Sequence, residues 1–235
     1  MRLTSMAHVA VLVLGLLIGL ILVSNLSFGQ EQSAQAKEVV LFDGSSLAAW
    51  DFHLVDPNVK LEDVWSVKDG VLVCKGEPLG YLHTRDDFKN FKLTLEWRWA
   101  PDTKPGNSGV LLRATGEPVG FMPKCVEAQL MHGSAGDIWA FFGFGVAGAQ
   151  ERLREVKDNE ALGDFKGVGA IKDAEKPAGE WNTYEIVLQG DRLVLTINGQ
   201  KVNEATGCDQ VAGKIGLQSE GGEIHFRNVK LIPLN

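Results

Sequence analysis

The sequence feature that most constrains the fold is a strict two-residue alternation from residue 91 to residue 99. Charged or hydroxyl side chains occupy every second position, and the positions between them are apolar: Phe91, Leu93, Leu95, Trp97 and Trp99. A period of two is typical of a strand with one face in the core and one face in solvent. The segment therefore predicts a half-buried β-strand.

The same alternation recurs further along the chain. It runs from Trp181 to Leu188 and from Arg192 to Ile197, and Gly190-Asp191 and Asn198-Gly199 interrupt it. Asn-Gly between apolar alternations predicts a tight hairpin, because both residues tolerate positive φ. We expect further strands at residues 65–75 (with a break at 69–70), 110–114, 125–131, 200–202, 214–218 and 223–232.

Short strands at this spacing, with no long amphipathic helix among them, favour an all-β fold. We expect a two-sheet antiparallel jelly-roll sandwich that forms a single domain over residues 39–235. The Gly-rich segment at about 143–180 is weakly patterned, and we interpret it as a loop insertion over one end or face of the sandwich. It is either functional or merely solvated, and its charged part, residues 150–160, is expected to hold a short helix.

The N-terminus has the layout of a secretory signal peptide. Arg2 precedes an apolar run from Val9 to Val23, and small and polar residues follow up to Gly29. The run is short for a membrane-spanning helix of about 20 residues, although an uncleaved anchor stays the alternative. We therefore expect a signal peptide at 1–29, a linker at 30–38, no stable membrane span after cleavage, and a periplasmic or secreted location.

Charge and cysteine content exclude some classes of function. The chain has 23 Lys and Arg and 30 Asp and Glu, which gives a net charge of −7. This acidic balance argues against nucleic acid as a partner. Its three cysteines, Cys74, Cys125 and Cys208, allow at most one disulfide and match no zinc-site spacing. We expect them mostly as buried small apolar residues.

The segment from Cys125 to His132 carries the first candidate site residues. Glu127 and Gln129 fall on the strand face opposite Val126, Ala128 and Leu130. A carboxylate and an amide therefore project from the same face if the apolar set faces the core. His132 comes just after the strand, and its alternative role is that of a hydrogen-bonded structural histidine.

Other candidates lie on the polar sides of neighbouring strands. Glu96 and Arg98 alternate with the tryptophans, Arg113 lies opposite Val110 and Leu112, and Asn107 is in a turn. Glu96 paired with either arginine could instead be an exposed ion pair that contributes about 0–1 kcal/mol. Outside these strands, Trp139 could offer its ring face to a sugar.

The order of these motifs resembles the 3-keto-disaccharide hydrolase domain family over about residues 39–234. The resemblance rests on a set of short strings that occur in one order along the chain: Leu41-Phe42-Asp43-Gly44, Trp65 with Asp69-Gly70, Leu95-Glu96-Trp97-Arg98, Asn107-Ser108-Gly109, Glu127-Ala128-Gln129, Gly179-Glu180-Trp181-Asn182, Asn198-Gly199, residues 213–220 and Phe226-Arg227-Asn228.

The resemblance implies a concanavalin-like jelly roll in an exported bacterial protein that cleaves the glycosidic bond of sugars oxidised at C3. A 3-keto group makes the C2 hydrogen acidic, so the C1 substituent can leave by elimination. Such a site needs a base near C2, a donor or cation at the enolate oxygen, and an acid at the leaving oxygen. The chain departs from the commoner family pattern after Gln129, where many members have an Asp and this one has Met131-His132-Gly133.

We assign candidate roles on this basis. Glu127 or His132 is the expected base, Arg113 or Arg98 the expected enolate stabiliser, and Glu96 a second acid or orienting group. Gln129 and Asn107 are expected to hold sugar hydroxyls, with Gln218 and Glu220 on the same face. No cofactor is certain; a divalent metal held by Glu127, His132 and Asp137 is an alternative to the arginine.

Two other functions stay open. One is a non-catalytic module that binds glycans, because a fold does not imply a function. The other is an ordinary two-carboxylate glycosidase, for which Glu96 and Glu127 are the evident pair. Carbohydrate is the expected partner in all three cases.

Overall fold

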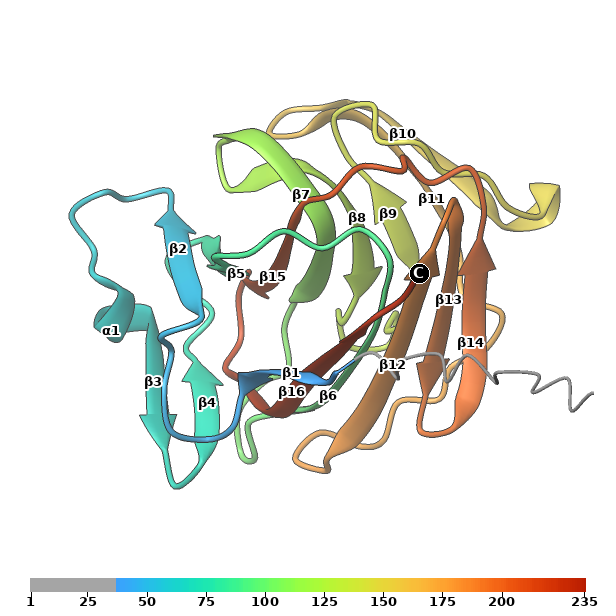
Figure 1. Cartoon of the computed structure of the whole chain (residues 1–235). Helices are drawn as coiled ribbons and strands as arrows, with labels where there is room; N and C mark the ends of the chain where they lie inside the picture. Colours follow the sequence, from blue (N-terminus) through green and yellow to red (C-terminus); the bar gives the residue numbers. More distant parts are fainter. Residues whose placement is uncertain (1–36) are drawn as a thin grey trace, which may run out of the picture. The chain divides into compact units, whose positions relative to one another are not determined.

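The computed structural model describes residues 37–235, which form a sandwich of two antiparallel β-sheets (Figure 1). The predicted signal peptide and most of the predicted linker lie outside these residues. Helical structure within them is limited to one turn, α1 (Leu61–Val64), and a 3₁₀ turn, η1 (Gln150–Arg152). Accordingly, no helix in the described part of the chain is long and apolar enough to cross a membrane.

The first sheet, sheet A, has the strand order β14-β13-β12-β6-β16-β4-β3, with β1 also paired to β16. Its strands are β1 (Val39–Phe42), β3 (Trp65–Lys68), β4 (Val71–Cys74), β6 (Phe91–Trp99), β12 (Asn182–Gln189), β13 (Arg192–Ile197), β14 (Gln200–Ala205) and β16 (Ile224–Pro233). Strand β6 lies near the middle of the sheet, between β12 and β16.

The second sheet, sheet B, has the order β10-β11-β9-β8-β7-β15-β5-β2. Its strands are β2 (Trp50–Leu54), β5 (Gly80–Thr84), β7 (Gly109–Val119), β8 (Met122–Gln129), β9 (Ile138–Ala140), β10 (Leu153–Asn159), β11 (Gly163–Val168) and β15 (Lys214–Ser219). The core lies between the two sheets.

The predicted alternation sets which side chains enter this core. Every apolar residue of β6 is buried, and every residue between them is partly exposed. On β8, Val126 and Ala128 belong to the core, as does Leu130 directly after the strand. Glu127 and Gln129 therefore point from the outer face of sheet B, the face turned away from sheet A, as predicted.

The predicted turns are also confirmed. Asp69 and Gly70 join β3 to β4, Asn198 and Gly199 join β13 to β14, and all four have positive φ. Positive φ at both central residues suits a two-residue hairpin loop whose twist matches that of the strands. The three cysteines are buried and free, in agreement with their predicted role as small apolar residues.

The segment interpreted as a loop insertion differs from its prediction. Its charged part begins with the short 3₁₀ turn η1 and then forms the strand β10, which pairs with β11 to extend sheet B beyond β9. Most side chains of this hairpin are exposed, so both of its faces carry polar residues and the two-residue apolar period is lost. Pattern alone therefore could not separate this hairpin from a solvated loop.

Candidate functional site

A cleft of about 230 Å³ opens on the outer face of sheet B. Its polar groups come from the starts and ends of the central strands, and its apolar wall comes from β9 and from the hairpin formed by β10 and β11. The polar lining residues are Asn107, Glu127, Gln129 and Glu220, and the wall includes Trp139, Phe141, Val156, Leu162 and Phe165. We call this cavity the cleft.

Glu127 lies at the floor of the cleft and is 1% exposed. Its Oε1 atom has no hydrogen-bond partner among residues 37–235. Burial raises the pKa of Glu127 well above its usual value, and the negative charge of Glu220 raises it further. Both effects favour the protonated form of Glu127.

Gly109 makes room for this carboxyl group. It lies opposite Gln129 across the pair of strands β7 and β8. A Cβ atom at Gly109 would stand 1.9 Å from Oε1 of Glu127 and 2.7 Å from Oε1 of Gln218. Only glycine lets Glu127 and Gln218 occupy this space over β7.

Glu220 follows β15 and lies opposite Asn107 in an isolated β-bridge. Burial raises its pKa to about 7, although hydrogen bonds from Asn107 and Gln218 oppose the increase. Within the described residues the amide oxygens of Asn107 and Gln218 have no partner. The cleft thus holds two carboxyl groups, Glu127 and Glu220, whose pKa values are both raised by burial.

The amide of Gln129 is held by its own backbone. Its Oε1 accepts hydrogen bonds from the N–H groups of Leu130 and Met131, each at 2.8 Å. The amide orientation is therefore fixed, and Nε2 is left as its donor.

The wall of the cleft is aromatic. The rings of Trp139 and Phe165 meet edge to face at a centroid distance of 5.4 Å, and Phe141 packs against Phe165 at 5.0 Å. Trp139, a residue predicted to face a sugar, lies in this wall. Phe165 and Leu162 come from the hairpin of β10 and β11, for which the sequence predicts a loop, so neither residue is identified from the sequence.

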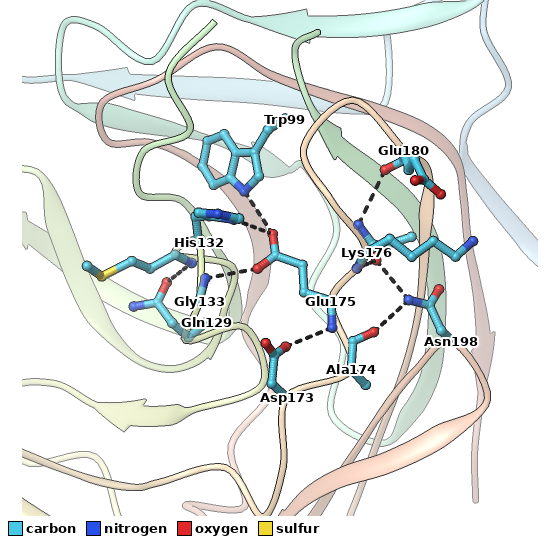
Figure 2. Close-up of polar contacts among 12 residues, drawn as sticks. Trp99, Gln129, His132, Gly133, Asp173, Ala174, Glu175, Lys176, Glu180 and Asn198 are labelled. Atoms are coloured by element: carbon cyan, nitrogen blue, oxygen red, sulfur yellow. Dashed lines mark hydrogen bonds and ion pairs between the residues drawn. The ribbon is translucent and has the colours of Figure 1, made fainter. Parts of the chain in front are cut away.

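His132 lies after β8, where the chain turns. Its Nδ1 lies 3.2 Å from Oε1 of Glu175, which also accepts a hydrogen bond from Nε1 of Trp99 at 3.1 Å. Figure 2 shows how these side chains face one another. The other carboxylate oxygen accepts from the N–H of Gly133 at 2.9 Å. Glu175, whose side chain is 3% exposed, therefore anchors the turn that begins after Gln129. No sequence pattern marks Glu175, because it lies in a segment without periodicity.

Glu96 and Arg98 are not brought to the cleft, because they project from the outer face of sheet A. Glu96 accepts two hydrogen bonds from Arg227, at 2.8 and 2.6 Å, and one from Asn228 at 2.6 Å. Although burial opposes the effect, these bonds hold the pKa of Glu96 below its usual value. Arg98 contacts Nδ1 of His225 at 3.2 Å and stacks on Trp181.

Arg113 is also separate from the cleft. The register of β7 and β8 shifts between Leu112 and Thr115, and Arg113 there has φ of +49°. Its guanidinium is fully buried and donates to backbone carbonyl groups of three different loops, those of Lys89, Gly190 and Asp209. This irregularity of the strand cannot be recognised from the apolar alternation of the sequence. At this position Arg113 connects three loops through its hydrogen bonds.

The predicted metal ligands are not gathered at one point. Among the described residues, no group of three or more His, Cys, Asp or Glu side chains lies close enough to hold a metal ion. Asp137 is instead bound by Nη1 of Arg154 at 2.5 Å and by the N–H of Ala170 at 2.6 Å. His132 faces Glu175, as described above.

The chain is similar to proteins that, by their names, act on carbohydrates. A family model described as a 3-keto-alpha-glucoside-1,2-lyase-like domain matches residues 37–232. A protein of Bacteroides thetaiotaomicron named 3-keto-disaccharide hydrolase is 22% identical, over 82% of this chain and 77% of that protein.

Solved structures share the fold. One from Parabacteroides distasonis, assigned by name to the glycosyl hydrolases, has a TM-score of 0.59 and 25% identity over 84% of this chain and all of its own. The carbohydrate binding module CBM66 of Bacillus subtilis has a TM-score of 0.55 and 12% identity over 77% of this chain and 94% of its own. The two-sheet arrangement is therefore that of the jelly-roll proteins that cleave or bind carbohydrates.

Proposed function

The chain belongs to the 3-keto-alpha-glucoside-1,2-lyase-like domain family, and we propose that it cleaves glycosidic bonds of 3-keto-glycosides by elimination in the cleft of sheet B. Family and relatives support a carbohydrate-active, glycoside hydrolase-like function. The observation that carries the finer proposal is the pair Glu127 and Glu220, two carboxyl groups that line one cleft and whose pKa values are both raised by burial. Glu127 is buried more deeply than Glu220, so we assign it as the acid and Glu220 as the base.

Glu220 is the base of the proposed reaction. Because burial raises its pKa to about 7, it is a stronger base than an ordinary carboxylate and is still largely ionised just above neutral pH. It takes the C2 proton of the substrate, which the 3-keto group has made acidic. The electron pair of the C2–H bond moves into the enolate of the C3 carbonyl.

Glu127 is the acid. Burial keeps its carboxyl group protonated, so it donates a proton to the oxygen that leaves C1 as the enolate collapses. The C1–O bond breaks and a C1=C2 double bond forms. Addition of water at C1 then completes a net hydrolysis, and release before that step gives a lyase. This assignment replaces the expectation that Glu127 is the base.

Amide groups replace the expected arginine at the enolate oxygen. Gln129, Gln218 and Asn107 supply uncharged donors or acceptors around the two carboxyl groups. Preorganised donors at a site of developing charge stabilise a transition state because they need no reorganisation. Arg113 and Arg98 are engaged elsewhere, so this step does not depend on them.

The oxygen atoms around Glu127 are also the type of ligand that a hard divalent cation takes. Oε1 of Glu127, Oε1 of Gln218 and Oδ1 of Asn107 are buried, and none has a partner among the described residues. A cation at this position would stabilise the negative charge of the enolate oxygen in place of the amide donors. The assay below therefore includes a chelator.

The test is incubation of the purified protein with 3-keto-trehalose, with and without chelator, followed by product analysis. We expect time-dependent loss of the substrate with release of glucose, together with either a C1=C2 product or a 3-keto sugar. Loss of activity in the chelator arm, restored by added metal, assigns a cation to the enolate. No turnover of 3-keto-trehalose by a folded protein that binds it contradicts the proposal and leaves a glycan-binding module.

A second candidate is an ordinary glycosidase that uses the same two carboxyl groups. Glu96 and Glu127, the pair evident in the sequence, point from different sheets, whereas Glu127 and Glu220 share the cleft. Cleavage of unoxidised p-nitrophenyl glycosides at a rate similar to that of the keto-substrate favours this candidate.

We also propose that the protein is exported, on the basis of the sequence of residues 1–29. N-terminal sequencing of the protein recovered from the periplasm or medium tests this proposal. A mature chain that starts near residue 30 supports it, and recovery of the intact chain from the cytoplasm contradicts it.

A further inference from the structure

A second cavity of about 300 Å³ lies on the outer face of sheet B, toward the strands β5 and β2. Its lining residues include Phe52, His53, Tyr81, His83, Pro118 and Pro123, and it shares none of them with the cleft. We call this cavity the ring pocket. None of the roles assigned above uses it.

The floor of the ring pocket is a row of three planar side chains. The ring of Tyr81 on β5 packs between two imidazoles, with centroid distances of 5.5 Å to His53 and 5.7 Å to His83. His53 pairs with Tyr81 across β2 and β5, and His83 lies two residues along β5, so all three point from one face. The strands thus hold a preformed aromatic surface.

The end of the hairpin between β7 and β8 is held to this surface. Nε2 of His53 is 2.8 Å from the carbonyl oxygen of Gly120, which lies in the turn of that hairpin. Pro118 and Pro123, on either side of the turn, line the pocket. A hydrogen bond between the hairpin turn and strand β2 therefore fixes the side wall.

Tyr81 contributes a hydroxyl group to the floor of the ring pocket. The residue is 5% exposed. Burial raises the pKa of Tyr81 to about 12, so the hydroxyl keeps its proton. A protonated phenol in the floor of a cavity can donate a hydrogen bond to a polar ligand in the pocket and accept one from it.

We propose that the ring pocket binds one neutral pyranose sugar. Aromatic rings with polar atoms at their edges match a pyranose, whose C–H face is apolar and whose rim carries hydroxyls. Thr115 and Glu117 add polar groups at the side. The amine of Lys214 is already held by Asp87 at 2.8 Å and by the carbonyl of Arg85 at 2.6 Å, so it does not favour an anionic ligand.

The site is separate from the cleft and does not rest on the proposed function. Tyr81 lies opposite Gln218 on β15, and β15 lies beside β7, which carries Gly109. Two strand spacings, about 10 Å, therefore separate the backbone of Tyr81 from that of Gly109, and the Tyr81 ring packs in the same apolar cluster as Met122 and Phe141 of the cleft. A sugar in the ring pocket binds without being cleaved there.

Tyrosine-selective NMR tests the proposal. The chain has two tyrosines, and the other one, Tyr184, is buried in the core between the sheets. Protein labelled with ¹³C at tyrosine Cζ is titrated with methyl α-glucopyranoside, which is unoxidised and inert to the proposed reaction. We expect the Tyr81 signal to shift saturably and the Tyr184 signal to stay constant.

Variants separate the ring pocket from the cleft. His83→Ala removes part of the floor and should abolish the saturable shift, whereas Trp139→Ala, which alters the cleft wall, should leave it unchanged. Tyr81→Phe, followed through the ring signals of ¹³C-labelled phenylalanine and histidine, should weaken binding about 5-fold, the effect of one neutral hydrogen bond. Tyr184→Phe is the matched control, because it removes the other phenol and should leave affinity unchanged.

Two results would overturn the proposal. One is the absence of any saturable Tyr81 shift up to the solubility limit of the sugar, in protein whose spectrum shows the native fold. The other is a shift that Trp139→Ala removes and His83→Ala retains, because that result places the sugar in the cleft. Neither result bears on turnover of 3-keto-trehalose, which is measured separately.

Discussion

Two glutamates at equivalent positions of the strand pattern have opposite environments. Glu127 on β8 and Glu96 on β6 each alternate with core residues and each point from the outer face of a sheet. Glu96 is 24% exposed and bound by Arg227 and Asn228, which lower its pKa. Glu127 is sealed under an aromatic wall with one oxygen unpartnered, and its pKa is raised.

The difference shows that the alternation of a strand determines the face from which a side chain points. It does not determine how deeply that side chain is buried or which charged groups surround it. An exposed carboxylate with ion-pair partners on neighbouring strands is stabilised in its charged form. A carboxyl group that surrounding elements remove from water, without a cationic partner, is stabilised in its neutral form. The first suits the surface of sheet A, and the second suits proton transfer in the cleft.

The largest expected effect comes from Glu127→Gln. Loss of the acid should reduce turnover of the keto-substrate about 10³-fold, because general acid catalysis contributes on this scale. The melting temperature should stay nearly unchanged, since the neutral amide has the shape of the neutral carboxyl group. Steady-state kinetics and thermal unfolding measure both. Full activity in a folded Glu127→Gln protein removes Glu127 from the mechanism.

Glu220→Gln should reduce turnover about 10²-fold through loss of the base. In the unmodified protein, activity should fall about tenfold per pH unit below pH 7, because protonated Glu220 cannot accept the C2 proton. A pH–rate profile measures this limb. An unchanged profile in Glu220→Gln would show that the base is another group, with His132 as the first alternative.

The same residue predicts a pH dependence of stability. Burial raises the pKa of Glu220 from 4.5 to about 7, so folding favours its protonated form. The resulting stabilisation is complete below about pH 4.5 and is lost as the pH rises through 7. Glu220→Gln, which stays neutral, should therefore be more stable than the unmodified protein at pH 8, by up to about 3 kcal/mol, and similar at pH 4. Denaturant unfolding at both pH values tests this sign.

Gly109→Ala should reduce turnover about tenfold without a charge change. The new Cβ would stand 1.9 Å from Oε1 of Glu127, so the carboxyl group must move away from its position over β7. The turnover of Glu96→Gln, a variant on the other sheet, is the control for this variant. A protein that tolerates alanine at 109 with full activity would show that the acid need not lie over β7.

The smallest effect is expected from Glu96→Gln. Turnover should stay within twofold, because Glu96 lies on the outer face of sheet A and contacts no group of the cleft. Unfolding free energy should fall by about 1 kcal/mol from the loss of a partly exposed ion pair. A loss of activity as large as that of Glu127→Gln would contradict the functional difference between the two faces.

Much of the fold could be predicted because local patterns and the tertiary structure agree. The alternation of β6, β8 and β12 and the Asn198-Gly199 turn each report a backbone geometry that neighbouring residues alone encode. The hairpin of β10 and β11 could not be recognised, because both of its faces are largely exposed.

The candidate site was predicted only in part. Glu127, Gln129, Asn107, Gln218, Glu220 and Trp139 were named from the sequence or the resemblance, and the structure brings them into or beside one cleft. Glu175 was missed, and Arg113 lies at a register shift of β7, where it binds backbone carbonyl groups outside the cleft. A bulge adds one residue to a strand, so the alternation of inward and outward side chains is shifted after it. The spacing of the apolar residues in the sequence does not reveal the bulge.

The sequence by itself determined the class of fold, the faces of the main strands and the membership of a family of carbohydrate-active proteins, since these follow from short-range periodicity and ordered motifs. Only the tertiary structure decided which carboxyl groups are chemically unusual. Desolvation depends on side chains distant in the chain, such as Phe165, which lines the same cleft as Glu127, and on a space that Gly109 leaves open. For the same reason only packing could reveal that Tyr81 and its two neighbouring histidines form a second pocket.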